Sequence, residues 1–217
     1  MNTHKALKEY LLSHNVRKLQ LCCGDNYIDG WFNTDLIENN IKGIHQLDVT
    51  KPFDIMDDSF QFIYLEHAIE HITIKDAEKM LLECRRILSK DGIIRIATPD
   101  LKKFVDKFYL SDSKIADRYC KWITDTFMPY YSKKGFYSKS LVINNLYHNW
   151  GHELVYDFES LSLLLNDVGF RDIRLKNTGD SRHIELQNLE SHYKHNDSNI
   201  DLYSLETMIL EASIEKP

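Results

Sequence analysis

Long apolar runs are missing from this sequence. No stretch approaches the roughly 18 apolar residues that a membrane-spanning helix needs, and the N-terminus lacks the apolar core of a signal peptide. We therefore expect a cytoplasmic protein without a membrane span. Cysteine is also scarce: Cys22, Cys23, Cys84 and Cys120 follow neither a metal-finger nor a disulfide-framework spacing. We interpret all four as reduced, buried side chains.

Glycine makes up only eight of the 217 residues, and the G-x-G-x-x-G fingerprint of dinucleotide-binding proteins is absent. In the corresponding segment 22–27 (CCGDNY), Gly24 is the only glycine of that fingerprint. This counts against a dinucleotide-dependent oxidoreductase. The formal net charge of −6 counts against a general affinity for nucleic acid. The chain also has no internal repeat, low-complexity tract or linker.

The composition is that of one globular domain, with 43% hydrophobic and 28% charged residues. Apolar patterns predict strands at 18–22, 31–36, 43–48, 60–65, 93–97, 170–175 and 205–214. Helical spacing predicts a helix over 3–15 with Thr3 as N-cap, a second between Thr73 and Asp91-Gly92, and a third between Asp157 and Gly169. Only residues 25–31 separate Gly24 from Phe32, so the first helix of an α/β alternation has no room.

Several polar or small residues directly follow the predicted strands. Because ligands bind beyond the carboxyl ends of strands in open α/β sheets, we expect these residues to share one edge. They are Gly24, Asp35, Asp48, Glu66 and Thr98. Glycine lets the backbone approach a ligand closely, and a carboxylate at the end of the second strand can accept both hydroxyls of a ribose. The pattern is typical of a site for an adenosine.

Ordered segments of the chain resemble the motifs of class I S-adenosylmethionine (SAM)-dependent methyltransferases, most closely the small branch found with surface-polysaccharide genes. They are 19–24 (LQLCCG), 30–36 (GWFNTDL), 60–72 (FQFIYLEHAIEHI), 85–100 (RRILSKDGIIRIATPD), 150–152 (WGH) and 156–157 (YD). The resemblance implies a Rossmann-like α/β fold: a seven-stranded, mostly parallel sheet with an antiparallel last strand. It also implies a single methyltransferase domain over 1–217, with a helical cap insertion at 101–153 that binds the acceptor.

The resemblance implies SAM as cofactor and S-adenosylhomocysteine as product. Cofactor contacts are expected from Leu21, Cys22, Cys23, Gly24, Asp35, Leu36, Asp48, Val49 and Glu66. In the family, the acid after the third strand accepts the adenine amino group, although Asp48 could also be a simple turn residue. Cys22 replaces the glycine that usually opens a Gly-x-Gly turn. The missing first helix removes a phosphate-binding N-terminus, which suits SAM because SAM carries no phosphate.

Methyl transfer to a hydroxyl needs a base, and histidine is the side chain best matched to that task near neutral pH. The candidates are His67, His71, His148 and His152, of which His67 and His152 rank first. Each could instead be a hydrogen-bonded residue that braces its loop.

The cap region has an unusual composition. Residues 101–150 carry nine Lys and Arg against four Asp, a net +5 that leaves −11 elsewhere, and twelve of the 25 aromatic residues. This stretch forms either a solvated helical cap with its own small core or a cover for an anionic, small-molecule acceptor such as a sugar phosphate or nucleotide sugar. The resemblance implies O-methylation of a sugar hydroxyl or phospho-substituent in capsule or lipopolysaccharide biosynthesis.

Two other functions stay open. Residues 67–71 (HAIEH) match the H-x-x-E-H pattern of a zinc-dependent hydrolase that would use His67, Glu70 and His71, with further ligands from His148 and His152. The buried strand before His67 places it in a turn rather than on a helix, so we assign no metal. A homologue that binds SAM without catalysis is the second alternative, because the glycine turn is altered.

Overall fold

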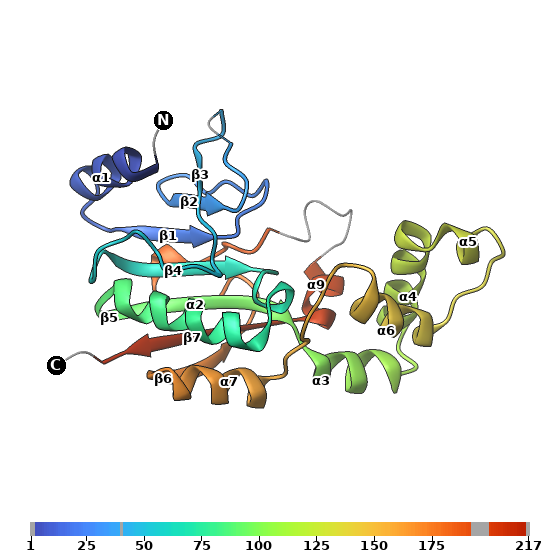
Figure 1. The fold of residues 1–217 in the computed structure, drawn as a ribbon. Coiled ribbons are helices and arrows are strands. Elements are labelled where there is room, and N and C mark those ends of the chain that lie inside the picture. The colour runs from blue at the N-terminus through green and yellow to red at the C-terminus, as the bar shows by residue number, and fades with distance from the viewer. Residues whose placement is uncertain (1–2, 40, 192–199, 216–217) are drawn as a thin grey trace.

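The computed structural model describes residues 3–39, 41–191 and 200–215. Its centre is a seven-stranded sheet in the order β3-β2-β1-β4-β5-β7-β6. All neighbours from β3 to β5 pair in parallel, whereas β7 is antiparallel to both β5 and β6. In Figure 1 the arrows of β1 and β4 point toward the helical cap, and the arrow of β7 points away from it. The predicted Rossmann-like fold with an antiparallel last strand is confirmed.

The strands are β1 (Lys18–Leu21), β2 (Phe32–Asp35), β3 (Ile44–Gln46), β4 (Phe60–Glu66), β5 (Leu88–Pro99), β6 (Phe170–Lys176) and β7 (Thr207–Ile214). The α-helices are α1 (Thr3–Ser13), α2 (Ile74–Ile87), α3 (Leu101–Lys103), α4 (Lys114–Phe127), α5 (Pro129–Ser132), α6 (Lys139–His148), α7 (Phe158–Asp167) and α9 (Ile200–Glu206). The 3-10 helices η1 (Ile69–His71) and η3 (Ile184–Leu186) and the π-helix η2 (Phe104–Tyr109) complete the elements.

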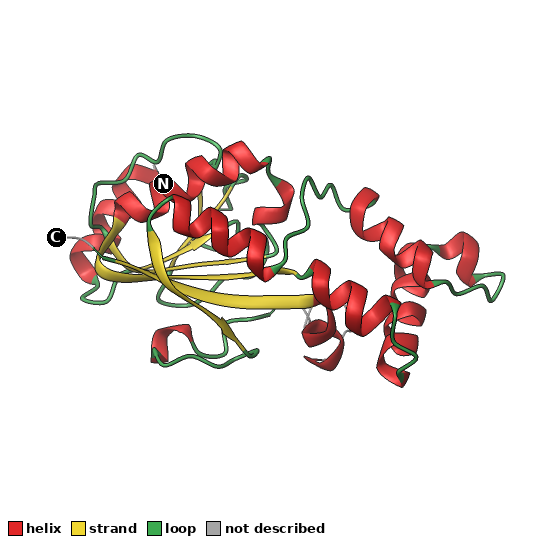
Figure 2. Cartoon of the chain, turned by 90° about the horizontal axis from the view of Figure 1, so that it is seen from below, coloured by secondary structure: helices red, strands yellow, loops and turns green. Residues whose placement is uncertain are grey.

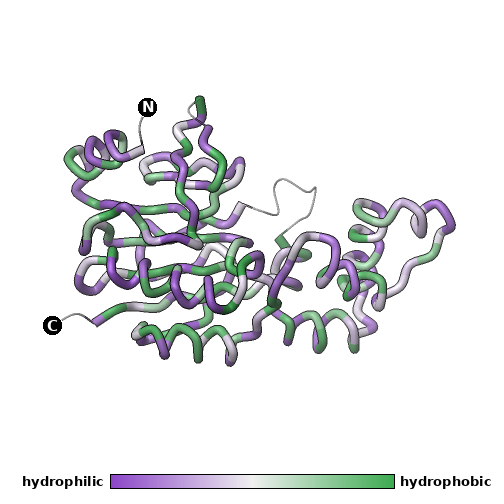
Figure 3. The backbone as a smooth tube through the Cα atoms, viewed as in Figure 1, coloured by the Kyte–Doolittle hydropathy of each residue, from purple (hydrophilic) through white to green (hydrophobic). Residues whose placement is uncertain are grey.

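Helices α1, α2 and α7 pack on one face of the sheet. Alternate residues of β4 and β5, such as Ile63 and Ile94, join the apolar stripes of these helices in the main hydrophobic core. Along α2 and α7, apolar and polar residues also follow one another at short intervals, as Figure 3 shows. The predicted caps Thr73 and Asp157 accept hydrogen bonds from the first turns of α2 and α7. Thr3 opens α1.

The opposite face of the sheet has no helix between β1 and β2 to cover it, as the short spacing predicted. Residues 177–191, here named the covering segment, pack there instead. Leu186 and Leu189 form a second apolar cluster with Trp31 and Tyr64. A segment from late in the chain therefore buries the surface that the absent helix leaves open.

A buried ion cluster holds the covering segment to the sheet. Arg95 of β5 is 0% exposed, and its Nε and Nη1 donate hydrogen bonds to Glu190 Oε1 (2.7 Å) and Glu211 Oε1 (2.6 Å). Arg95 Nη1 also reaches the Asp180 carbonyl (2.9 Å). Because a fully buried charge needs partners, this cluster fixes where the covering segment lies.

The cap extends beyond the ends of the strands as a group of helices (Figure 2). It has its own apolar cluster, centred on Phe104, Phe108, Tyr119 and Ile123. The Leu101 amide bonds the Tyr156 carbonyl (2.8 Å) where the chain leaves and re-enters the sheet layer. None of the described helices is long and apolar enough to span a membrane.

Some predicted boundaries are wrong. Helix α2 ends at Ile87 rather than at Asp91-Gly92, and the strand starts at Leu88. Asp91 instead lies within β5 with φ 59°, at an irregularity where the register to β4 shifts between Phe60 and Phe62. The predicted final strand from Leu205 begins at Thr207, because α9 precedes it. Residues 192–199 of the long predicted connection lie outside the described residues.

Candidate active site

The glycine turn and the acid of β2 meet at the carboxyl edge of the sheet. The Gly24 amide donates a hydrogen bond to Asp35 Oδ2 (2.8 Å), and the Cys23 amide donates to the Thr34 carbonyl (3.0 Å). Gly24 has φ 53°, and a Cβ built on it would meet nothing within 4 Å. The backbone of the turn therefore faces open space beside a partly exposed carboxylate, which fits a ribose-bearing ligand.

Cys22 directly follows β1 and is half-buried. Burial, followed by the nearby charges of Asp35, Cys23, Glu70 and Asp48, raises the pKa of its thiol to about 12. The thiol is therefore neutral at physiological pH. Cys22 also has φ 50°, a conformation that usually favours glycine, so the residue that replaces the expected glycine keeps a glycine-like backbone.

Asp48 follows β3 and is held by its own turn. Its Oδ1 accepts hydrogen bonds from the Thr50 hydroxyl (2.6 Å) and the Thr50 amide (2.9 Å). These bonds lower the pKa of Asp48, so its carboxylate is ionised at neutral pH. The geometry is that of the turn residue considered above, while a contact with adenine stays a prediction.

Glu66 at the end of β4 is buried and bonded within the protein. Tyr203 donates a hydrogen bond to its Oε1 (2.8 Å), and the Ser191 amide lies 3.1 Å from its Oε2. No pattern near Glu66 in the sequence indicates these partners, because both belong to the distant connection between β6 and β7. A cofactor contact from Glu66 stays a prediction.

The other predicted cofactor residues differ in exposure. Leu21 is fully buried in the main core, Val49 and Cys23 are buried, and Leu36 is exposed. The Leu21 side chain is therefore not accessible to a ligand. Whether these residues contact SAM stays a prediction.

His67 pairs with a buried glutamate. Its Nδ1 lies 3.3 Å from Glu70 Oε1, and its Nε2 lies 3.1 Å from the Thr207 hydroxyl. Burial lowers the pKa of His67, but the hydrogen bond and charge of Glu70, together with the charges of Glu206 and Glu66, raise it overall. The Thr98 hydroxyl donates to Glu70 Oε2 (2.9 Å). His67 thus favours the charged form, paired with Glu70.

His152 has the opposite character. Burial lowers its pKa, with His71 and His67 acting in the same direction against the charge of Glu70, so the ring is neutral at pH 7. Its buried Nδ1 has no hydrogen-bond partner among the described residues. The His152 ring lies against His71, with 4.8 Å between ring centroids.

Three of the four predicted histidines line one pocket between sheet and cap. This pocket of about 350 Å³ is bounded by His67, His71, Pro99, Trp122, Ile123, Phe127, Leu146, Trp150, His152 and Glu206. The fourth histidine, His148, is exposed at the end of α6 and does not line it. The sequence did not identify the aromatic wall or Glu206, whose carboxyl accepts a hydrogen bond from Tyr119.

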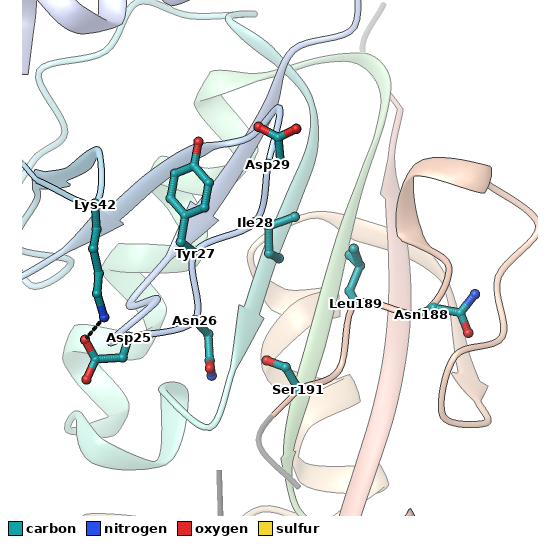
Figure 4. Close-up of a pocket in the computed structure, with 9 residues that line it drawn as sticks. All are labelled: Asp25, Asn26, Tyr27, Ile28, Asp29, Lys42, Asn188, Leu189 and Ser191. Carbon is teal, nitrogen blue, oxygen red and sulfur yellow. Dashed lines mark hydrogen bonds and ion pairs between the residues drawn. The ribbon is translucent and has the colours of Figure 1, made fainter. Parts of the chain in front are cut away.

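A larger pocket of about 590 Å³ lies where the first helix is missing. The loop 25–29, Lys42 and the end of the covering segment line it, and Lys42 pairs with Asp25 (Figure 4). None of the predicted cofactor or catalytic residues lines this pocket. The pocket between sheet and cap, with its histidines, is the better candidate for chemistry.

The H-x-x-E-H pattern does not form the expected zinc set. His67 points its Nδ1 at Glu70, and its backbone φ of 47° places it in a turn, as predicted. The donor atoms that gather within 4.8 Å of one another come instead from Glu70, His71 and His152. Nothing supports the zinc-dependent hydrolase.

Comparisons with known proteins agree with the fold. Residues 25–96 match the model of a methyltransferase domain. A crystal structure of a SAM-dependent methyltransferase from Archaeoglobus fulgidus has a TM-score of 0.51 and 16% identity, and covers 97% of this chain and 92% of its own. A SAM-dependent methyltransferase from Thermotoga maritima, described as a possible histamine N-methyltransferase, has a TM-score of 0.50 and 14% identity. The match covers 99% of this chain and 90% of the Thermotoga maritima chain. No curated protein sequence matches the chain.

The solved structures, at these identities, show that the fold is shared. The domain match adds the activity; it begins directly after Gly24 and covers β2, β3, β4 and most of β5. Together they support a SAM-dependent methyltransferase, with SAM as the methyl donor.

Proposed function

We propose that this enzyme transfers the methyl group of SAM to a hydroxyl oxygen of a small, sugar-like acceptor bound between sheet and cap. The observation that carries the proposal is His152: its neutral ring is in the wall of the 350 Å³ pocket, and its buried Nδ1 has no hydrogen-bond partner among the described residues. Such a nitrogen can take the proton that a hydroxyl loses as its oxygen is methylated.

Bound SAM supplies a methyl group that its sulfonium already activates. In this proposal Asp35 accepts the ribose hydroxyls, while the Gly24 turn and the residues at the ends of β1 and β3 hold the rest of the cofactor. The charges of Asp35 and Glu70 both raise the pKa of Cys22, which supports a cofactor site close to the histidine pocket. The protein then gains most of the rate by holding acceptor and methyl group in line.

The aromatic wall of Trp122, Phe127 and Trp150 supports a ring-shaped acceptor, because aromatic faces pack against the C–H face of a sugar. A charged substituent, such as a phosphate, would lie outside this wall, since no Lys or Arg is among the lining residues. The +5 charge of residues 101–150 supports an anionic acceptor of that kind. The role in capsule or lipopolysaccharide synthesis, the cap as acceptor-binding insertion and the cytoplasmic location are proposed on the sequence alone.

The test is an assay of methyl transfer from SAM to a panel of sugars, sugar phosphates, nucleotide sugars and amines. Transfer is measured by the release of S-adenosylhomocysteine and by the mass of the product. We expect an oxygen-methylated sugar product. Transfer only to amine nitrogens would refute the oxygen acceptor. Binding of S-adenosylhomocysteine without transfer to any acceptor would favour the homologue that binds SAM without catalysis.

A further inference from the structure

Three donor side chains gather where η1 meets the loop after α6. Glu70 and His71 come from η1, and His152 comes from that loop. One ligand atom from each lies within 4.8 Å of the others. Two imidazoles and one carboxylate are a donor set that proteins use for divalent transition metals.

The backbone holds the two segments together without any metal. The Glu153 amide donates a hydrogen bond to the Glu70 carbonyl (2.8 Å), and the Leu154 amide lies 3.3 Å from the same oxygen. These bonds fix the His152 loop directly on η1, although the two are 82 positions apart in sequence (152 against 70). The backbone therefore already holds the three donor residues close together before any metal binds.

The Glu70 carboxylate is buried and already oriented. Its side chain is 0% exposed, with Thr98 on Oε2 and His67 on Oε1. A carboxylate has about four lone-pair positions, so these two partners leave room for a cation. Hydrogen-bonded carboxylates of this kind are typical of metal ligands, since the second partners fix the ligand's direction.

The two histidines supply the nitrogen donors of the set. His152 Nδ1 is buried without a hydrogen-bond partner among the described residues, so its position offers an unused donor atom. Ligand atoms on tetrahedral zinc lie roughly 3.4 Å apart, so the donors must approach one another slightly. His71 is exposed, and a rotation of its ring provides that approach.

We propose that Glu70, His71 and His152 form a binding site for a divalent first-row transition-metal ion such as Zn²⁺ or Co²⁺. The nitrogen donors disfavour Mg²⁺ and Ca²⁺, which prefer oxygen ligands. The site differs from the H-x-x-E-H pattern because His67 orients Glu70 and is not a ligand, and it departs from the expectation that no metal is held. Since His71 and His152 line the acceptor pocket, the cation would face the acceptor.

This proposal concerns metal binding and does not depend on the acceptor. If the site held a cation, the ion would lower the pKa of an acceptor hydroxyl that coordinates it, and His152 would serve as a ligand instead of as the base. The metal-free form keeps His152 Nδ1 for the proton. The two forms can be separated by a chelator.

The experiment uses the full chain, purified without a polyhistidine tag and stripped of metal. Zn²⁺ is titrated by calorimetry, and Co²⁺ is added while visible absorption bands are recorded. We expect one equivalent per chain and Co²⁺ bands typical of nitrogen and oxygen ligands. His71→Ala should weaken binding by about 100-fold or more, since it removes a ligand. The matched control His148→Ala, which changes another exposed histidine nearby, should bind as wild type.

Two results would overturn the site: wild-type protein without a stoichiometric, saturable metal, or His71→Ala with the affinity of His148→Ala. Because His71 is exposed, its variant should retain the wild-type circular dichroism spectrum and melting temperature. A protein that binds metal but methylates no acceptor would refute only the proposed function. An active enzyme that binds no metal would refute only this inference.

Discussion

Asp35 is the residue on which the proposed cofactor site depends most directly. Asp35→Ala removes a charge-assisted contact to the ribose, and we expect SAM affinity to fall by about 2 kcal/mol or more. Because Asp35 also accepts the Gly24 amide, Asp35→Asn is the sharper variant, since it keeps a hydrogen-bond acceptor and loses the charge. Titration calorimetry with S-adenosylhomocysteine measures the cofactor affinity of both Asp35 variants. Asp29→Ala, in the exposed loop nearby, is the control, and unchanged affinity in both Asp35 variants would contradict the role.

His152 predicts a pH dependence of turnover. Burial and the neighbouring histidines hold its pKa below the ordinary 6.5, so its base form is present at neutral pH and is lost only below that range. With a chelator present, kcat should fall on the acid side with an apparent pKa below 6.5. His152→Ala should lower kcat and remove that acid limb while SAM affinity stays nearly intact. A collapse of SAM binding in this variant would instead mean that His152 supports the cofactor site.

At the scale of elements, the covering segment depends on Arg95. Arg95→Met leaves buried Glu190 without its arginine and Glu211 with Lys176 alone, so we expect the free energy of unfolding to drop by about 3–5 kcal/mol. The control is Arg174→Met, which breaks only an exposed pair with Asp172, worth about 1 kcal/mol or less. Urea denaturation compares the two. The rate of amide hydrogen exchange in residues 177–191 should rise in Arg95→Met. If both variants lost the same free energy of unfolding, the role of Arg95 in holding the covering segment would be refuted.

Elements that follow local rules were predictable, and those that depend on distant partners were not. Thr73, Asp157 and Gly24 act within a few residues of themselves, so the sequence located their caps and turn. The partners of Glu66, by contrast, are about 125 positions away, and no pattern near Glu66 points to them. Arg95 differs from Glu66, because a charge inside the apolar run 93–97 itself implies a buried partner.

The candidate site divides in the same way. The sequence identified His67, His71 and His152 from short motifs, and the structure brings all three to one pocket. It could not separate His148, because one-turn spacing from His152 requires a continuous helix and α6 ends at His148. The aromatic wall comes from two separate parts of the cap, α4 with Trp122 and Phe127 and the loop with Trp150, so only the tertiary fold assembles it.

At the scale of the whole molecule, the sheet and the cap divide the charge between them. Residues 101–150 carry +5 and the remainder carries −11, so the cap presents a positive field above a negative body. Because no Lys or Arg lines the described pocket, this field acts over distance, through solvent, where salt screens it within about 10 Å at 0.1 M. An anionic acceptor would therefore be attracted to the cap but not gripped by a charge inside the pocket.

That arrangement predicts a specific salt dependence. For an anionic acceptor such as a sugar phosphate, KM should rise several-fold between about 0.02 and 0.5 M salt, while kcat stays nearly constant, because screening weakens approach and not the bound geometry. The matched neutral sugar should show no such rise. Reversing charge at two exposed cap lysines that lie outside the pocket, Lys133→Glu and Lys134→Glu, should raise KM for the anionic acceptor at low salt and bring it close to the high-salt value. Equal salt dependence for both acceptors would show that the charge of the cap serves another purpose.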